Sequence, residues 1–369
     1  MLVSQNVEEL TPYQPGKPVK EVERELGIRD TIKLASNENP LGASPKATAA
    51  VLAMAHEANR YPEGGCYYLR KKLAALLQLQ EENLVFGNGS NEIIELVIRT
   101  FVLPGEEILF FDPSFAVYPI IAKAADRDFR AVPLRQDSFE MNVDDMLAAI
   151  GPRTKALFIT TPNNPVGNYI PHGELVRLIS ATPANVLVCV DEAYVEYATE
   201  GDCRTVIDLV LQYENLLIMR TFSKAYGLSG YRIGYGVGSP KIINYLNKTR
   251  QPFNVNLLAQ TAAEAALDDR EFLDASVGNN SREMQRIVDC ISLLGLTHVP
   301  SQANFILIDT LGPGRPVFEG LLREGVIVRH IPHPMIANFV RVTVGTPAEN
   351  SIFLEKFAKV LRQEGRLAN

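Results

Sequence analysis

The sequence TFSKAYGLSGYRIGY occupies residues 221–235 and combines an amine with groups that bind phosphate. Thr221 and Ser223 offer hydroxyl groups, and Arg232 offers a planar guanidinium that matches phosphate oxygens. Lys224 is then left to attack an aldehyde. An isolated lysine in a loop is usually only solvated, so this interpretation depends on the surrounding sequence.

Upstream of this segment, short runs rich in β-forming residues alternate with helical patterns from residue 80 to residue 240. The runs are EILFF (107–111), ALFIT (156–160), VLVCV (186–190) and LLIMR (216–220). Their nearly continuous apolar character is typical of parallel strands that are covered on both faces. The sequence therefore predicts an α/β core, in which the lysine segment follows a strand.

Polar residues follow three of these predicted strands. Asn164 comes after ALFIT, Asp191 after VLVCV and Lys224 after LLIMR. In open α/β sheets, ligands bind at the carboxyl ends of the strands, so we expect a ligand site at this edge. For Asp191 alone, a role as the cap of a following helix is an alternative.

The segment GNGSNE (87–92) predicts a second part of this site. Apolar residues recur at helical spacing directly after it, at Ile94, Val97, Ile98 and Phe101. A glycine-flanked loop that leads into a helix exposes backbone amides, which bind anions. An ordinary turn followed by a helix would show the same pattern.

The pattern changes beyond residue 256, where helical segments are followed by ANFILI (303–308) and VRVTV (340–344). This order predicts a smaller α+β domain packed on the first. In VRVTV, three valines alternate with Arg341 and Thr343, which places Arg341 away from the core side. Periodicity alone favours a solvated face for Arg341.

We expect three parts in the chain: an N-terminal arm (1–30) that packs with the small domain, a large ligand-binding domain (31–255) and the small domain (256–369). The stretch TPYQPGKPV in the arm is predicted to be extended, because each proline removes an amide donor. These prolines are Pro12, Pro15 and Pro18.

Composition excludes several classes of function. Hydrophobic residues make up 46% and charged residues 21% of the 369 residues, as in ordinary globular proteins. The formal charge is −7 without a basic stripe, which argues against nucleic acid as a partner. The N-terminus lacks the features of a signal peptide and no apolar run approaches the ~20 residues of a membrane span, so we expect a cytoplasmic protein.

The four cysteines form no CxxC pair and the five histidines show no metal-ligand spacing. We therefore expect reduced cysteines and no metal site. His330 and His333 lie close together in HIPHPM, and their role stays open.

Several motifs in their order along the chain resemble the type I aminotransferases. These are NNPVGN (163–168), DEAYVEY (191–197), the lysine segment TFSKAYGLSGYRIGY and RVTVGT (341–346). Further motifs resemble histidinol-phosphate aminotransferases in particular: SNENPLG (36–42), RYPEGG (60–65), GNGSNE (87–92), PFNVN (252–256) and ANFILI (303–308). The resemblance covers nearly the whole chain. It implies the type I pyridoxal 5′-phosphate (PLP) transferase fold: a large domain with a mostly parallel seven-stranded sheet and a smaller α+β domain.

The resemblance implies a catalytic role for three residues. Lys224 would hold PLP as a Schiff base and act as the base in the 1,3-proton transfer, roles that suit a desolvated amine. Asp191 would accept the proton of the pyridine nitrogen and so preserve the electron sink. Tyr194, with Asn164, would hydrogen-bond the phenolic oxygen of the cofactor, although Tyr194 alone could equally be a core aromatic.

The resemblance also implies contacts along the rest of the cofactor. Phe115 in DPSFAVY matches the position at which the family stacks an aromatic ring on PLP. Tyrosine is commoner there, and phenylalanine keeps the ring face while losing a hydroxyl. The cofactor phosphate would be bound by amides of a helix start, by hydroxyls and by a guanidinium, from Ser90, Asn91, Glu92, Thr221, Ser223 and Arg232.

The remaining implied roles concern the substrate and a second subunit. Tyr61 in RYPEGG would reach the cofactor phosphate of a neighbouring subunit, which makes the active unit a homodimer. Arg341 would bind the carboxylate of the amino donor, and Arg329 with Tyr13 would bind the phosphate of histidinol phosphate. Arginine suits both groups because its fork accepts carboxylate or phosphate oxygens.

The activity implied is transamination between L-histidinol phosphate and 2-oxoglutarate, which gives 3-(imidazol-4-yl)-2-oxopropyl phosphate and L-glutamate in histidine biosynthesis. An aromatic amino acid aminotransferase and a threonine-phosphate decarboxylase share the same lysine, aspartate and arginine pattern and stay open as alternatives. A non-catalytic PLP-binding regulator is a remote alternative, because a Pro-rich arm stands where a DNA-binding module would begin.

Overall fold

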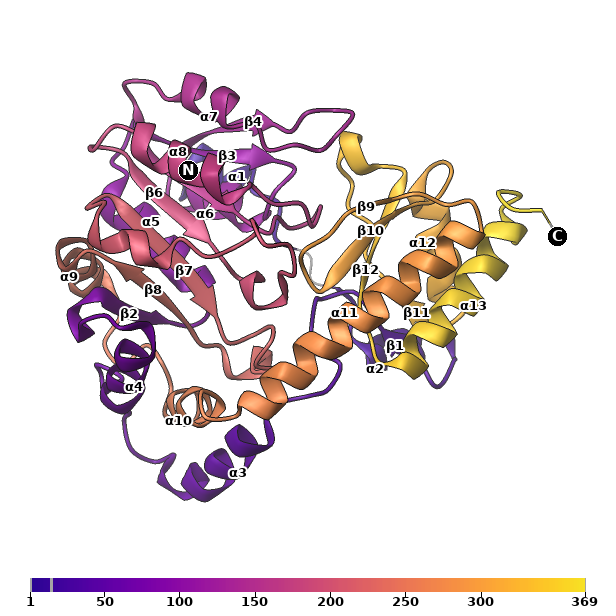
Figure 1. The fold of residues 1–369 in the computed structure, drawn as a ribbon, viewed down its shortest axis with the longest axis horizontal. Helices are drawn as coiled ribbons and strands as arrows, with labels where there is room; N and C mark the ends of the chain where they lie inside the picture. Colours follow the sequence, from indigo (N-terminus) through magenta and orange to yellow (C-terminus); the bar gives the residue numbers. More distant parts are fainter. Residues whose placement is uncertain (1, 14–15, 369) are drawn as a thin grey trace.

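The computed structural model describes residues 2–13 and 16–368 and has a seven-stranded sheet in its larger lobe (Figure 1). The strand order is β2-β8-β7-β6-β5-β3-β4. Strand β8 runs antiparallel to both of its neighbours, and all other pairs are parallel. The predicted α/β fold with a mostly parallel sheet is therefore confirmed. The strands are β2 (Leu84–Gly87), β3 (Glu107–Asp112), β4 (Asp128–Pro133), β5 (Thr154–Thr160), β6 (Leu187–Asp191), β7 (Leu216–Thr221) and β8 (Gly234–Gly238).

Helices cover both faces of this sheet, which explains the apolar runs in its strands. In β5, Ala156 and Phe158 pack towards one layer of helices, and Leu157 and Ile159 pack towards the other. The first layer consists of α5 (Ser90–Phe101), α6 (Val117–Ala124) and α9 (Pro240–Thr249). The layer on the other face includes α3 (Pro45–Met54), α4 (Tyr67–Leu77), α7 (Val143–Ala149), α8 (His172–Ala181) and α10 (Leu257–Ala266).

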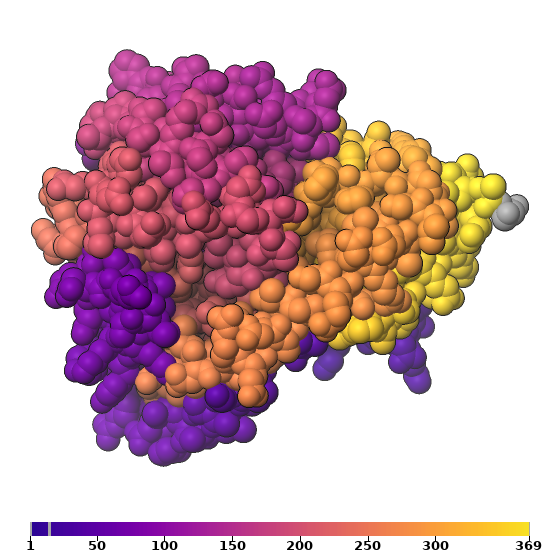
Figure 2. All heavy atoms as spheres, viewed as in Figure 1, coloured from indigo at the N-terminus to yellow at the C-terminus, as the bar shows by residue number. Residues whose placement is uncertain are grey.

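The smaller lobe is built on a three-stranded antiparallel sheet in which β10 (Phe305–Asp309) lies between β9 (His298–Val299) and β12 (Phe339–Thr343). Its core includes residues of α11 (Arg270–Leu293), α12 (Gly314–Arg323) and α13 (Pro347–Gln363). Helix α11 runs from the side of α10 to the smaller lobe (Figure 1), and the orange surface in Figure 2 shows the same connection between the lobes. The predicted α+β character of this part is confirmed.

Capping residues set the starts of several helices. Thr346 and Glu349 form a capping box at α13, where Pro347 occupies the first turn. The side chains of Asn256 and Ser239 accept backbone hydrogen bonds at the starts of α10 and α9. The short 3-10 helices are η1 (Ala55–Glu57), η2 (Glu81–Asn83), η3 (Val195–Tyr197), η4 (Ile207–Leu211), η5 (Ser229–Tyr231) and η6 (Pro334–Ile336).

The N-terminal segment contains two helices, α1 (Gln5–Glu8) and α2 (Val19–Leu26), which the proline-based prediction of an extended arm did not anticipate. Pro12 and Pro18 lie outside both helices, so each helix avoids the loss of an amide donor. Gln14 and Pro15 lie outside the described residues. Helix α2 contacts the smaller lobe, since Val22 packs with Ile327.

After α2, β1 (Ile32–Lys33) pairs in parallel with β11 (Val326–Ile327) of the smaller lobe. The division at residues 30 and 255 stays a prediction. Among the described helices, none combines the length and the apolar character that crossing a bilayer requires.

Candidate active site

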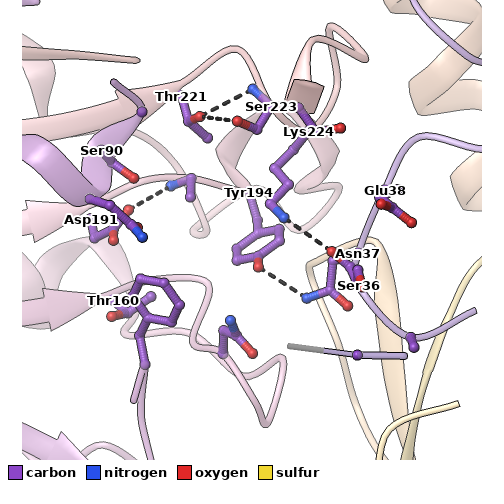
Figure 3. Close-up of a pocket in the computed structure, with 18 of the residues that line it drawn as sticks. Ser36, Asn37, Glu38, Ser90, Thr160, Asp191, Tyr194, Thr221, Ser223 and Lys224 are labelled. Carbon is purple, nitrogen blue, oxygen red and sulfur yellow. Dashed lines mark hydrogen bonds between the residues drawn. The ribbon is translucent and has the colours of Figure 1, made fainter. Parts of the chain in front are cut away.

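A cavity of about 280 Å³ lies where the parallel strands end. Thr160, Asp191 and Thr221 are the last residues of β5, β6 and β7, and all three line this cavity (Figure 3). Asn164 and Lys224 line it from the loops that follow β5 and β7. The structure thus brings together the polar residues that were expected at this edge of the sheet.

Asp191 places a carboxyl group at the buried end of the cavity, where only 2% of the residue is exposed. Its Oδ1 accepts a hydrogen bond from the Ala193 amide at 3.2 Å, and its Oδ2 accepts one from Tyr118 Oη at 3.2 Å. Burial raises the pKa of Asp191 to about 6. The alternative role as a helix cap does not hold, because η3 begins at Val195 with Tyr194 in the capping position.

Lys224 directs its amine into the cavity towards the segment at Ser36 (Figure 3). The Nζ atom lies 3.4 Å from Ser36 O and 5.6 Å from the ring centre of Tyr194. Burial, with the positive charge of Arg341, lowers the pKa of Lys224 to about 8. About a tenth of this amine is therefore unprotonated at pH 7, far more than for an ordinary lysine, and the unprotonated amine is the nucleophile.

A phosphate-sized anion has donors at the end of the cavity where α5 begins. Gly89 has a φ of +74°, and a Cβ there would lie 2.7 Å from Nη2 of Arg232, so glycine permits this close approach. The Thr221 hydroxyl donates to Ser223 Oγ at 2.9 Å, and Arg232 Nη1 lies 3.4 Å from the same oxygen. Together with the free amides of the first turn of α5 from Ser90, these groups can bind phosphate.

Asn91 and Glu92 occupy different positions at this helix start. Asn91 lines the cavity, whereas Glu92 is absent from its wall among the described residues. The Glu92 carboxylate accepts hydrogen bonds from the Asn88 amide at 2.5 Å and from Asn254 Nδ2 at 3.0 Å. The side chain of Glu92 thus supports the loop, and only its amide, in the first turn of α5, can serve an anion.

Asn164 and Tyr194 each use one hydrogen-bonding group on a protein neighbour and keep another for a ligand. Arg341 Nη1 donates to Asn164 Oδ1 at 2.6 Å, so the amide NH2 of Asn164 is the group that can donate to a ligand. Tyr194 Oη accepts from Asn37 Nδ2 at 3.0 Å, which leaves its hydroxyl hydrogen for donation. Phe115 lines the same cavity and offers a ring face.

Arg341 and Arg329 form the wall on the side of the smaller lobe. Their backbones pair, with N–O distances of 3.0 and 2.8 Å, which places the two residues side by side. Arg341 also donates to Ala35 O at 2.7 Å, and its buried Nε has no partner among the described residues. Burial lowers the pKa of Arg341 to about 10, so its guanidinium is charged at neutral pH. Tyr13, which is 52% exposed, lines the cavity beside them.

Tyr61 differs from the other predicted side chains of the site, because it is not among the described residues that line the cavity of its own chain. Its side chain is 83% exposed and stacks on Phe253, with ring centres 4.8 Å apart. The residue is therefore available to a second molecule.

Several residues at the site have no role implied by the sequence motifs. Ser36, Asn37 and Glu38 line the cavity, and their motif SNENPLG was noted only for its resemblance. Tyr118, which contacts Asp191, lies in DPSFAVY three residues after Phe115, and nothing in the sequence marks this contact. Within the described residues, no cluster of three His, Cys, Asp or Glu side chains could hold a metal ion.

The sequence profile of the family "Aminotransferase class I and II" matches residues 29–357. The chain therefore belongs to the class I and II aminotransferases. It is 46% identical to histidinol-phosphate aminotransferase 2 of Pseudomonas fluorescens strain Pf-5, over 98% of this chain and 97% of that protein. It is 44% identical to histidinol-phosphate aminotransferase of Moorella thermoacetica, over 95% of this chain and 91% of that protein.

Solved structures show the same fold. Histidinol-phosphate aminotransferase from Sinorhizobium meliloti, in complex with pyridoxal-5′-phosphate, superposes with a TM-score of 0.91 at 25% identity and covers 98% of both chains. A double mutant of aspartate aminotransferase from Thermus thermophilus superposes with a TM-score of 0.82 at 25% identity, over 97% of this chain and 99% of that chain. The type I aminotransferase fold expected from the motifs is confirmed.

The residues of the cavity fit PLP by their chemistry. Asp191 is a buried carboxyl whose two oxygens bind only neutral donors, which suits a cationic ring nitrogen. Lys224 offers an amine with a lowered pKa for an aldehyde. The start of α5 and Arg232 offer donors for a phosphate.

Proposed function

We propose that this protein is a PLP-dependent transaminase that interconverts L-histidinol phosphate and 2-oxoglutarate with 3-(imidazol-4-yl)-2-oxopropyl phosphate and L-glutamate, a step of histidine biosynthesis. The observation that carries the proposal is the pair Arg329 and Arg341, which lines the same cavity as Lys224 and Asp191. Similarity to histidinol-phosphate aminotransferases over nearly the whole chain supports the same substrate.

The cofactor would be held at four points by residues of the larger lobe. When bound, PLP supplies a carbonyl group that carries the amino group and a ring that acts as an electron sink. Asp191 would face the ring nitrogen, and Phe115 would stack on the ring. Asn164 and Tyr194 would donate hydrogen bonds to the phenolic oxygen, and the donors at the start of α5 would bind the phosphate.

Lys224 would serve twice, first as the amine that binds the aldehyde of PLP and then as the base that moves a proton at Nζ. Its pKa of about 8 lies close to neutral pH, where a base is most effective in both directions of transfer. Asp191, with a pKa of about 6, is mostly ionised at neutral pH and would keep the proton on the ring nitrogen.

The two arginines would recognise the acidic ends of both substrates in turn. Histidinol phosphate carries a phosphate, and glutamate carries two carboxylates. The guanidinium fork accepts either group, so one site can bind the substrates alternately. Arg341 would take the carboxylate next to the reacting carbon, and Arg329 with Tyr13 would take the phosphate or the distal carboxylate.

We also propose a homodimer in which Tyr61 contributes to the cofactor site of the partner subunit. The support is its 83% exposure and its fixed position on Phe253, outside the cavity of its own chain. A cytoplasmic location accompanies this proposal, since all four cysteines are unpaired thiols, which suits a reducing compartment.

The proposed substrate is tested by steady-state kinetics with four amino compounds: histidinol phosphate, phenylalanine, tyrosine and threonine phosphate. We expect kcat/KM for histidinol phosphate to be at least tenfold above that for phenylalanine or tyrosine, because the phosphate can pair with Arg329 whereas the aromatic side chains offer no anionic group to it. Faster turnover of phenylalanine would favour the aromatic enzyme instead. Release of carbon dioxide from threonine phosphate would favour the decarboxylase.

A further inference from the structure

Tyr118 is a buried tyrosine behind the cavity wall, and it contacts two residues of that wall. It is 0% exposed, and its Oη lies 2.6 Å from Thr160 Oγ1 and 3.2 Å from Asp191 Oδ2. Thr160 and Asp191 are register partners at the ends of β5 and β6 (Figure 3). One phenol therefore joins the ends of two neighbouring strands at the base of the site.

The directions of these hydrogen bonds follow from the charge of Asp191. An ionised carboxylate can only accept, so the single hydrogen of Tyr118 must point to Asp191 Oδ2. Thr160 then donates its hydroxyl hydrogen to Tyr118 Oη. Burial, together with the charge of Asp191, raises the pKa of Tyr118 well above its ordinary value, so the phenol keeps its hydrogen.

Aromatic packing fixes the ring of Tyr118 independently of its hydroxyl. The ring stacks on Phe158, with centres 4.9 Å apart at 30°, and meets the edge of Phe115 at 5.8 Å and 90°. The same side chain therefore touches both the residue that would stack on the cofactor and the carboxylate that would face its ring nitrogen. Removal of the hydroxyl alone leaves this packing in place.

We propose that Tyr118 is a positioning residue, which donates a hydrogen bond to Asp191 and thereby keeps this carboxylate ionised and aimed at the ring nitrogen of PLP. This role rests on the proposed cofactor, and it does not depend on which amino substrate the enzyme uses. It adds to the cofactor site a residue that acts through Asp191.

Several neighbours of Asp191 influence its pKa, and the hydrogen bond from Tyr118 is one of those that lower it. Burial raises the pKa of Asp191, and the nearby Glu192 raises it further. The hydrogen bond from Tyr118 is the strongest of the influences that lower it, ahead of the Ala193 amide and the charge of Lys224. Burial raises the pKa of two further neighbours, Cys189 and Tyr194, and the charge of Asp191 adds to this rise.

The test measures the dissociation constant of PLP from the full-length protein as a function of pH, in the absence of substrate. Affinity is expected to fall on acidification, as Asp191 becomes protonated and no longer pairs with the ring nitrogen. In Tyr118→Phe the carboxyl is protonated at a higher pH, so the midpoint of this fall moves up by about one pH unit relative to wild type.

Two controls separate this role from a general effect of losing a buried hydroxyl. Tyr235→Phe removes a hydroxyl from a residue of β8 that is 5% exposed and is expected to leave the midpoint unchanged. Asp191→Asn is expected to bind PLP weakly at every pH and to lack the fall in affinity that protonation of Asp191 causes. A folded Tyr118→Phe protein with the wild-type midpoint would overturn the proposal.

Thr160→Val tests the direction of the hydrogen bonds and also decides the question if Tyr118→Phe does not fold. If Thr160 donates to Tyr118, its loss weakens the phenol as a donor, and the midpoint moves up by less than in Tyr118→Phe. A midpoint that stays or moves down would mean that Tyr118 donates its hydrogen to Thr160 in the wild type instead of to Asp191, and the proposal fails. If wild-type protein does not bind PLP at all, the proposed function itself fails, which is a distinct result.

Discussion

The two sides of the cavity are built in different ways. On the cofactor side, Thr160, Asp191 and Thr221 end three hydrogen-bonded strands and are each less than a tenth exposed. On the substrate side, Tyr13 is 52% exposed and Arg329 lies in a connection after the two-residue strand β11. The sheet therefore fixes Asp191, and Lys224 follows the end of β7 by three residues. Tyr13 and Arg329 lie on less regular structure, whereas the third substrate-side residue, Arg341, is held within β12.

This difference predicts how mutations should act. Changes on the cofactor side should lower kcat whichever amino donor is used, because the reacting groups serve every substrate. Changes on the substrate side should mainly raise KM and should do so differently for a phosphate and for a carboxylate.

The largest effect is expected for Lys224→Ala. Loss of the amine removes both the group that holds the cofactor aldehyde and the base that moves the proton, so kcat should fall by about 10³-fold or more. Single-turnover rates with glutamate, followed by cofactor absorbance, would measure this. Lys248→Ala, on α9, is the matched control and should keep wild-type rates. Residual activity within tenfold of wild type would contradict the assignment.

Asp191→Asn is expected to lower kcat by about 10²-fold and to stabilise the apoprotein. In the folded apoprotein, burial raises the pKa of Asp191 from 3.8 to about 6, so the ionised carboxylate destabilises the fold at pH 7 by up to about 3 kcal/mol. Asparagine is neutral and avoids this cost.

The sign of this stability difference can be checked by urea unfolding of both apoproteins across pH. Above pH 6 the folded carboxyl of the wild type is ionised, and Asp191→Asn should be more stable by about 1–3 kcal/mol. Below about pH 3 the wild-type carboxyl is mostly protonated in both the folded and unfolded states, so the gap should close. A gap that is constant with pH would mean that the carboxylate charge is not its cause.

On the substrate side, Arg341→Lys and Arg329→Lys are expected to lower kcat/KM by about 10-fold to 100-fold, mainly through KM, because lysine loses the fork geometry. Arg341→Lys should affect mainly the donors that carry a carboxylate next to the amino group, glutamate and phenylalanine, whereas Arg329→Lys should affect histidinol phosphate more than phenylalanine. Arg315→Lys, on the exposed side of α12, is the control. Equal losses for both donors in Arg329→Lys would remove Arg329 from phosphate recognition.

The smallest effect is expected for Tyr61→Phe, which removes one hydroxyl from the proposed partner contact. PLP affinity should weaken by about threefold to tenfold in the dimer, since one hydrogen bond to a charged group is lost. Equilibrium dialysis at protein concentrations above and below dimer dissociation measures it. The control is Tyr68→Phe, which should leave the affinity unchanged. Tyr68 is exposed, as Tyr61 is, and it lies on α4.

Much of the fold could be predicted because its strands are apolar on both faces. The runs at 107–111, 156–160 and 216–220 each lie within β3, β5 and β7. Strand β8 escaped prediction because its sequence GYGVG has three glycines, which disfavour strands. At one of them, Gly234, a Cβ would lie 2.6 Å from Ser90 N, so tertiary packing requires the glycine.

The site was predictable where chemistry constrains the residue type, and less so where packing does. Asp191, Lys224 and Arg232 could be assigned from the sequence, because their side chains suit a ring nitrogen, an aldehyde and a phosphate and follow one another in recognisable motifs. Tyr118 and Asn37 carry no such signal, because a buried tyrosine or asparagine is common and only the three-dimensional contacts show that they face Asp191 and Tyr194. Periodicity alone favours a solvated face for Arg341, and this expectation is wrong, because the residue is 8% exposed and lines the cavity.

The most direct measurement is reduction of the PLP-loaded protein with borohydride, followed by peptide mass mapping. The account predicts one phosphopyridoxyl group per chain, attached to Lys224. A modified lysine elsewhere, or a protein that remains colourless with added PLP and yields no adduct, would contradict it.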